Sequence, residues 1–242
     1  MTTVATTAPR ESAKNNVSDA VPGSVAKQAV AARIAALRTL AESDPLAAQD
    51  ATWAWFQRLG AELPGEAAEA ELAAIFAAGQ PADVDGQTEG LLVGWLAPQD
   101  LDRAGSFVYR SARTVVEKLG VLPWLGKKFD KSAQRGTNTM SLTAWLVAAP
   151  FAPMSPGYRL KNVGGGKVEG FDMLNFVEES VVSPGTQVLV LDYENIGTNP
   201  WPINQIRDEA VQIVPGTYLG AKLWHQEDGY RQLAFWAAKI PA

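Results

Sequence analysis

The chain has 242 residues, a formal net charge of −5 and 47% hydrophobic residues, which is typical of a globular protein with a sizeable core. This acidic balance argues against general nucleic-acid binding, which depends on an excess of Lys and Arg. The chain has no cysteine, and this excludes disulfides, thiolate catalysis and zinc–thiolate or iron–sulfur centres.

Residues 1–23 are rich in Thr, Ala, Ser and Asn and contain little that a fold could bury, so they are predicted to form a disordered tail. They lack the apolar core of a secretory signal peptide. The longest apolar run, residues 142–154, contains two prolines and is too short to span a bilayer. We therefore expect no transmembrane segment and a cytoplasmic location.

Residues 24–80 carry the pattern of three amphipathic helices and are predicted to form a helical appendage. Ser24 is suited to cap the first helix. Asp44-Pro45 supplies an N-cap and a first-turn proline for the second helix, which is expected to end near Gly60. The third helix is predicted over residues 66–78. The apolar faces of these helices need a partner surface.

Residues 81–242 are predicted to form an antiparallel, barrel-like domain with one inserted helix at about 106–119. Pro, Gly and Asn turns separate the predicted strands, and a long antiparallel meander usually curls to protect its edges. The glycine-rich segment 163–170 indicates a hairpin turn, because no helix follows it. The fold class is therefore α+β, with N-terminal helices packed on a bent antiparallel sheet or calycin-like barrel. The predicted strands are 88–96, 141–149, 158–163, 170–178, 187–193, 203–214, 218–226 and 231–239.

The last hairpin gives the most specific geometric prediction. If the Pro215-Gly216 turn pairs Val214 with Thr217, Asp208 lies opposite Leu223 and diagonal to His225. Asp208 and His225 would then be a buried acid and imidazole suited to general acid–base catalysis. The alternative is that His225, near the end of its strand, is solvated at the mouth of a turn. The opposite face would carry Arg207, Glu209, Lys222 and Trp224.

The segment 123–138 predicts the entrance to a cavity. Trp124, Lys127 and Phe129 alternate like the start of a strand, and a polar loop follows, with Arg135 and Asn138 at its edge. A positively charged rim around an apolar cavity would accept an amphiphile with an anionic head, whereas Trp124 and Phe129 could instead plug the barrel end. The candidate ligand-binding residues are Trp95, Trp124, Lys127, Arg135, Trp145, Tyr193, Arg207, Trp224 and Trp236.

Other kinds of site receive little support. Scattered carboxylates such as Asp83 and Asp85 lack the loop pattern of a calcium site and have no histidine partners, so we predict no metal site and no cofactor. A nucleophilic serine in a Gly-x-Ser-x-Gly elbow is also missing.

Three segments together resemble a poorly characterised bacterial family. This family has a Trp-x-Gly-Lys-x-Phe element, here Trp124–Phe129, followed by a strand-rich C-terminal half; the Leu191–Tyr193 strand end and Arg207–Gly220 complete the resemblance. It covers about residues 85–242. The general shape is also similar to the calycins, the lipocalins and fatty-acid-binding proteins, although the lipocalin Gly-x-Trp signature is absent. Neither resemblance implies a catalytic residue.

Three functional hypotheses follow. The first is binding of a small hydrophobic or amphipathic molecule in a barrel cavity, gated by the helix at 106–119. The second is an enzyme acting on such a ligand, with Asp208 as acid or base, His225 as its partner, and Arg207 or Tyr193 orienting an anion or carbonyl. The third is an interaction protein that forms a homo-oligomer through the N-terminal helices.

Overall fold

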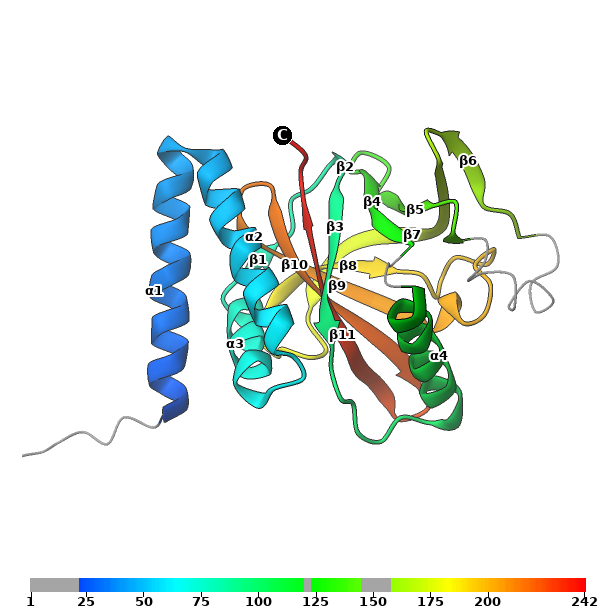
Figure 1. Ribbon diagram of the computed structural model, residues 1–242, viewed down its shortest axis with the longest axis horizontal. Helices are drawn as coiled ribbons and strands as arrows, with labels where there is room; N and C mark the ends of the chain where they lie inside the picture. Colours follow the sequence, from blue (N-terminus) through cyan, green and yellow to red (C-terminus); the bar gives the residue numbers. More distant parts are fainter. Residues whose placement is uncertain (1–21, 120–122, 145–157) are drawn as a thin grey trace, which may run out of the picture.

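The computed structural model describes residues 22–119, 123–144 and 158–242. Three helices, α1 (Pro22–Ser43), α2 (Pro45–Glu62) and α3 (Glu66–Ala77), lie on one side of a strongly curved antiparallel sheet, and α4 (Arg103–Leu119) lies near its opposite end (Figure 1). The α+β class is confirmed. The predicted tail falls outside the described residues, apart from its last two, which begin α1.

The second helix begins where its capping signal predicts, whereas the cap predicted at Ser24 is wrong, because α1 begins at Pro22 and Ser24 lies within it. The Asp44 side chain accepts a hydrogen bond from the backbone N of Ala47 at 3.0 Å, and Pro45 occupies the first turn of α2, where a missing N–H costs nothing. Arg38 of α1 extends to the sheet and donates to the carbonyl of Ile213 at 2.9 Å. The helices are therefore joined to the sheet by polar as well as apolar contacts.

Within residues 22–119, 123–144 and 158–242, the sheet contains eleven strands. Its order is β2-β4-β5-β7-β8-β9-β10-β11-β3, with β1 pairing to β9 and β6 to β7, and every pairing is antiparallel. A short 3₁₀ turn, η2 (Ile203–Gln205), leads into β9. The strands are β1 (Gln80–Pro81), β2 (Gly86–Gln87), β3 (Glu89–Trp95), β4 (Trp124–Asp130), β5 (Arg135–Ser141), β6 (Lys161–Gly164), β7 (Lys167–Glu179), β8 (Gln187–Asp192), β9 (Ile206–Val214), β10 (Thr217–Gln226) and β11 (Gly229–Lys239).

The sheet is nearly closed because its two end strands are consecutive in the chain. Only Thr88 separates β2, which pairs with β4, from β3, which pairs with β11. The backbone N and side-chain Oγ1 of Thr88 both donate to the carbonyl of Lys127, at 2.9 and 2.8 Å. The result is a nearly closed antiparallel barrel with helices, which fits a calycin-like architecture.

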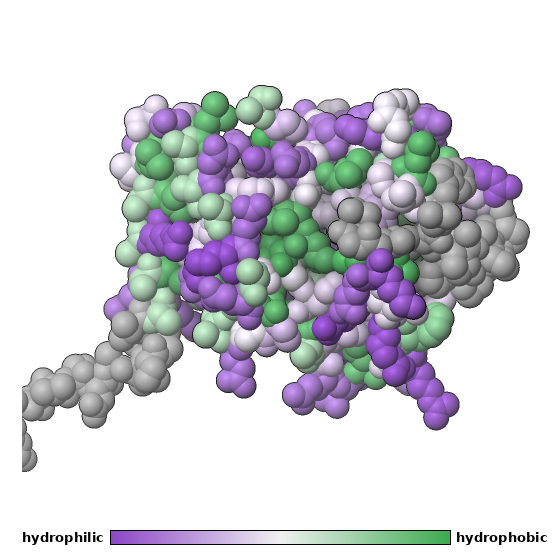
Figure 2. Space-filling model, in the orientation of Figure 1, coloured by the Kyte–Doolittle hydropathy of each residue, from purple (hydrophilic) through white to green (hydrophobic). Residues whose placement is uncertain are grey.

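Strand alternation divides most of the buried side chains among the described residues into two cores, and a smaller third cluster contains Met140, Ala144, Leu160 and Val168. The outer face of the barrel packs on the helices, where Val211, Leu219 and Phe235 meet Trp55 and Phe76. The inner face encloses a second core that includes Leu191, Trp224 and Trp236. On the face of the molecule shown in Figure 2, hydrophobic side chains gather between the N-terminal helices and α4.

The strand prediction is wrong around residue 135. The polar loop expected after Phe129 contains the start of β5. Of the strand expected at 141–149, Ser141 is the last residue of β5, and residues 145–149 fall outside the described part. The polar sequence RGTNTMS did not indicate a strand, because Asn138, whose side chain faces the interior, is polar. The hairpin predicted at 163–170 is confirmed: β6 and β7 pair across Gly165 and Gly166.

Candidate functional site

The register of the β9–β10 hairpin determines which side chains enter the barrel. Val214 pairs with Thr217 as predicted, but the next pair is Gln212 with Tyr218, so Ile213 is an extra residue in β9. A two-residue type I′ turn needs positive φ at both central positions, which proline cannot adopt. Pro215 followed by Gly216 (φ 75°) therefore makes a turn that is accompanied by a bulge. The predicted register beyond this point is wrong by one residue.

Because of this shift, Asp208 pairs with Lys222 and not with Leu223. The predicted Asp208–His225 contact is absent: the side chain of His225 is 45% exposed, and its Nδ1 lies 2.9 Å from Oε2 of Glu194. His225 also stacks on Tyr230, with ring centroids 4.7 Å apart. The alternative of a solvated histidine near the turn describes the structure correctly.

Arg207 and Glu209 lie on the outer face of the barrel. Arg207 forms ion pairs with Glu209 and Glu178, both at 3.0 Å. Glu209 is fully buried and also accepts hydrogen bonds from the hydroxyl of Ser180 and the backbone N of Val181. The structure therefore separates Arg207 from the barrel interior, although it was predicted to contact a ligand.

Four polar side chains meet inside the barrel, each from a different strand or strand end. Lys127 of β4 donates from Nζ to Oδ2 of Asp208 at 2.8 Å, to Oη of Tyr193 at 2.6 Å and to Oδ1 of Asn138 at 3.2 Å. Asn138 donates from Nδ2 to Tyr193 at 3.1 Å, and Tyr193 donates to Oδ2 of Asp208 at 3.3 Å. Three acceptors around Nζ match the three N–H donors of an ammonium group. We call these four residues the polar cluster.

Burial and charge shift the pKa values of the cluster in different directions. Burial lowers the pKa of Lys127, and the attraction of Asp208 opposes this only in part. Burial alone would raise the pKa of Asp208, but Lys127 and Lys222 outweigh it and hold that pKa below its usual value. Burial, assisted by Asp208, raises the pKa of Tyr193 well above its usual value. Tyr193 therefore remains a phenol and Asp208 a carboxylate at neutral pH.

A cavity of about 180 Å³ adjoins the polar cluster inside the barrel. Its charged lining residues are Lys127, Lys222 and Asp208, so the lining has one excess positive charge. Most of the remaining lining is apolar. The lining residues are Leu92, Trp95, Trp124, Lys127, Asn138, Met140, Phe171, Tyr193, Ile203, Ile206, Asp208, Lys222, Ala234 and Trp236.

Aromatic rings surround one side of the cavity and the Lys127 ammonium. The rings of Trp124 and Trp236 meet edge to face with centroids 5.9 Å apart, and Lys127 Nζ lies 4.8 Å from the Trp236 ring centroid. Gly220 makes room for this ring, because a Cβ added there would lie 2.1 Å from Cε2 of Trp236. Trp95 meets Tyr109 of α4 edge to face at 5.6 Å, which connects the cavity wall to that helix.

Several polar atoms of the lining are buried without a hydrogen-bond partner among the described residues. They are the indole Nε1 atoms of Trp95, Trp124 and Trp236, and Oδ1 of Asp208. Native proteins satisfy most buried polar atoms, and each unpaired one costs about 1–3 kcal/mol. Their concentration around one cavity indicates that a bound molecule or water supplies the missing partners.

The structure thus brings together six of the predicted site residues. Trp224 is buried beside the cavity but does not line it; its Nε1 donates to Oδ1 of Asp102 at 3.2 Å, just before α4. Trp145 lies outside the described residues. The six that line the cavity are Trp95, Trp124, Lys127, Tyr193, Asp208 and Trp236.

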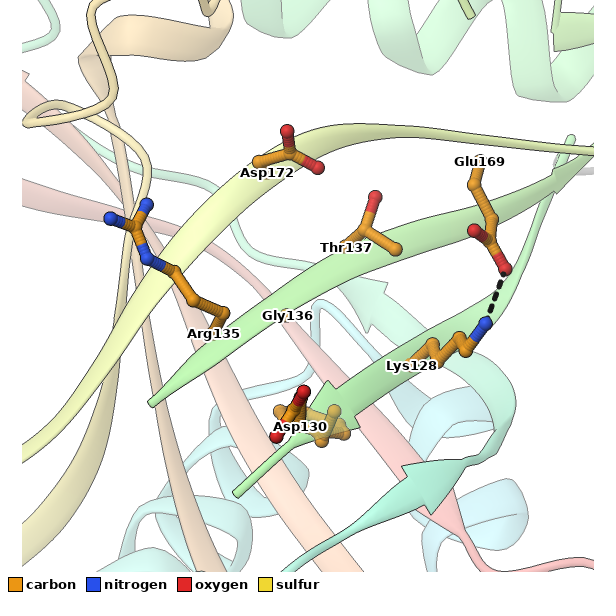
Figure 3. A pocket seen from close by; sticks show the side chains of 8 residues that line it. Lys128, Asp130, Arg135, Gly136, Thr137, Glu169 and Asp172 are labelled. Carbon is orange, nitrogen blue, oxygen red and sulfur yellow. Dashed lines mark hydrogen bonds and ion pairs between the residues drawn. The ribbon is translucent and has the colours of Figure 1, made fainter. Parts of the chain in front are cut away.

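Arg135 lies in a different hollow, on the outer face of strands β4, β5 and β7 (Figure 3). This hollow of about 290 Å³ carries charges of both signs, and Lys128 and Glu169 form an ion pair at 3.3 Å within it. Arg135 and Lys127 therefore do not form the expected positive rim together.

Sequence reasoning missed two polar lining residues. Asn138 was placed at the edge of a loop, and Lys222 was assigned to the opposite face by the wrong register. The signal for Lys222 was present in the chain, because proline at the first turn position argues for a bulge. The polar character of β5 left no comparable signal for Asn138.

Among the described residues, no three His, Asp or Glu side chains are grouped so that they could hold a metal ion. No helix in the described ranges is long and apolar enough to cross a membrane.

No protein-family model and no curated protein matches the sequence. A solved structure of a protein from Thermomonospora curvata is similar to 78% of this chain and 99% of its own, at 15% identity and a TM-score of 0.38. This likeness is too distant to assign a family or a function.

Proposed function

We propose that this protein binds a small, largely apolar molecule with one polar group inside its barrel. The observation that carries the proposal is the set of unpaired buried polar atoms around the apolar cavity. A site with few polar groups in a mainly apolar lining is typical of small-molecule binding. Because the lining has one excess positive charge, we expect the polar group of the ligand to be neutral or anionic rather than cationic.

The cavity volume narrows the class of ligand. At about 180 Å³ it is slightly larger than the apolar cavity of about 150 Å³ that binds benzene in an engineered protein. It suits a single-ring molecule better than a long acyl chain. The tryptophan rings of the wall favour a flat ligand, since aromatic surfaces stack on one another.

The proposal predicts that a single-ring molecule such as phenol, benzoate or the related hydrocarbon toluene binds in the barrel, which isothermal titration calorimetry and tryptophan fluorescence can detect. The variant Ala234→Leu places a larger side chain in the cavity and should abolish this binding. Ala234→Gly, its matched control, leaves the space open and should retain it. If none of these probes binds the unaltered protein, or if Ala234→Leu binds them as well as Ala234→Gly does, the proposal is wrong.

A further inference from the structure

The two carboxylate oxygens of Asp208 have different surroundings. Oδ2 accepts hydrogen bonds from Lys127 at 2.8 Å and from Tyr193 at 3.3 Å. Oδ1 has no hydrogen-bond partner among the described residues, although the Asp208 side chain is only 1% exposed. A carboxylate oxygen has the capacity for two hydrogen bonds, so Oδ1 is an unused acceptor in the cavity wall.

Lys222 supplies a cation close to this acceptor but beyond hydrogen-bond length. Lys222 Nζ lies 3.6 Å from Asp208 Oδ1, which is an ion pair but not a hydrogen bond. An oxygen atom placed beside this pair, rather than on the line between the two atoms, can lie about 2.8 Å from both, because twice that length exceeds their separation. Such an oxygen must donate to the carboxylate and accept from the ammonium. A hydroxyl does both, whereas an ether or carboxylate oxygen cannot donate and an ammonium cannot accept.

We propose that the cavity recognises a single-ring molecule by a hydroxyl group that donates to Asp208 Oδ1 and accepts from Lys222 Nζ. This inference rests on the proposed function and adds the chemistry of the polar group. The phenol class combines the required hydroxyl with a ring that suits Trp95, Trp124 and Trp236. Lys222 is suited to the role because its side chain is 34% exposed and is not held in the polar cluster.

The test compares four probes by calorimetry at neutral pH: phenol, toluene, anisole and benzoate. Phenol and toluene have nearly the same shape, but only phenol has a hydroxyl; anisole keeps the oxygen without the donor. A hydrogen bond to a buried charged group should make phenol bind about tenfold or more tightly than toluene or anisole. If toluene binds and phenol binds no better, the hydroxyl inference is overturned while the cavity remains a binding site. That result would mean that water occupies the position between Asp208 and Lys222. If benzoate binds most tightly, the inference is also overturned, in favour of an anionic ligand. If no probe binds, the proposed function itself fails.

Two variants identify the partner of the hydroxyl. Lys222→Met removes the ammonium and keeps an apolar stem, so it should reduce the preference for phenol over toluene several-fold. Lys128→Met, the matched control, changes a lysine of the outer face that is paired with Glu169, and it should leave the preference unchanged. An equal preference in Lys222→Met and in the unaltered protein would remove Lys222 from the site. The ratio of the two affinities is measured within each variant, so a change in stability affects both alike.

Discussion

Asp208 is the residue on which both the barrel interior and the proposed site depend. Its Oδ2 accepts hydrogen bonds within the polar cluster. Its Oδ1 has no hydrogen-bond partner among the described residues and lies 3.6 Å from Lys222 Nζ. A buried ion pair adds little net stability, because the cost of taking both charges out of water offsets their attraction. Removing only one partner is far more damaging, since the other charge is then buried alone. Lys127, whose side chain is 3% exposed, is such a partner.

We therefore expect Asp208→Asn to lower the free energy of unfolding by about 3–5 kcal/mol, because Lys127 loses its carboxylate. The double variant Lys127→Met with Asp208→Asn removes both charges and should be more stable than Asp208→Asn alone. Urea unfolding of Asp208→Asn, of Lys127→Met alone, of the double variant and of the parent measures the coupling. If the loss of unfolding free energy in the double variant equals the sum of the losses in the two single variants, the ion pair does not hold the polar cluster together.

At the scale of single elements, the contact between Asp102 and Trp224 holds the N-terminal end of α4 in place. The Asp102 side chain accepts from the backbone N of Gly105 at 2.5 Å and from Trp224 Nε1 at 3.2 Å. The same carboxylate thus caps the helix and attaches it to the inner core. Because Tyr109 of α4 contacts Trp95, this helix packs directly against the cavity wall.

Asp102→Ala should loosen the first turn of α4, because it removes the cap and leaves the Trp224 indole N–H buried without a partner. Loss of the cap alone costs about 1 kcal/mol. Hydrogen exchange of residues 103–109 should become faster, while exchange in β9 stays unchanged. Asp102→Asn keeps an acceptor oxygen and is the control. Exchange of residues 103–109 that is as slow in Asp102→Ala as in the parent would show that Asp102 does not anchor α4.

The sequence predicted those helices and strands whose side chains repeat with one period and pack against one kind of surface. The helical spacing of Leu72, Ile75 and Phe76 matches the apolar part of the outer sheet face against which the helices pack, and α3 lies where it was expected. The inner face follows no such rule. Its polar residues pair across the barrel with strands that are distant in sequence, so neither β5 nor the partner of Asp208 could be identified from local pattern. The bulge beside Pro215 then moved every later side chain of β10 to the other face.

At the scale of the whole molecule, the N-terminal helices and the barrel share one core. Trp55, Phe56 and Leu59 of α2 are almost fully buried in the same cluster as Leu219 and Phe235 of the sheet. The division of the chain into a helical appendage at 24–80 and a barrel domain at 81–242 remains a prediction. The shared core argues that the barrel depends on the helices.

Removal of residues 1–78 should therefore prevent the barrel from folding into a stable monomer. Exposing a large apolar side chain costs about 1.5–3 kcal/mol, and several on the outer face of the sheet would be exposed together, against a total stability of about 5–15 kcal/mol. Near-ultraviolet circular dichroism and light scattering would show lost packing or association. A chain lacking only residues 2–21 keeps the helical contacts and should melt like the parent. A monomeric, cooperatively melting product of the longer truncation would contradict this prediction.

The single segment 86–95 supplies both end strands of the barrel sheet, because only Thr88 separates β2 from β3. β2 pairs with β4 on one side of it, and β3 pairs with β11, the final strand of the chain, on the other. Contacts between segments so distant in sequence carry a high entropic cost and tend to form late. The cavity therefore forms only after the C-terminal strand has docked against β3, and we expect a nascent chain that lacks this strand to lack the proposed binding site.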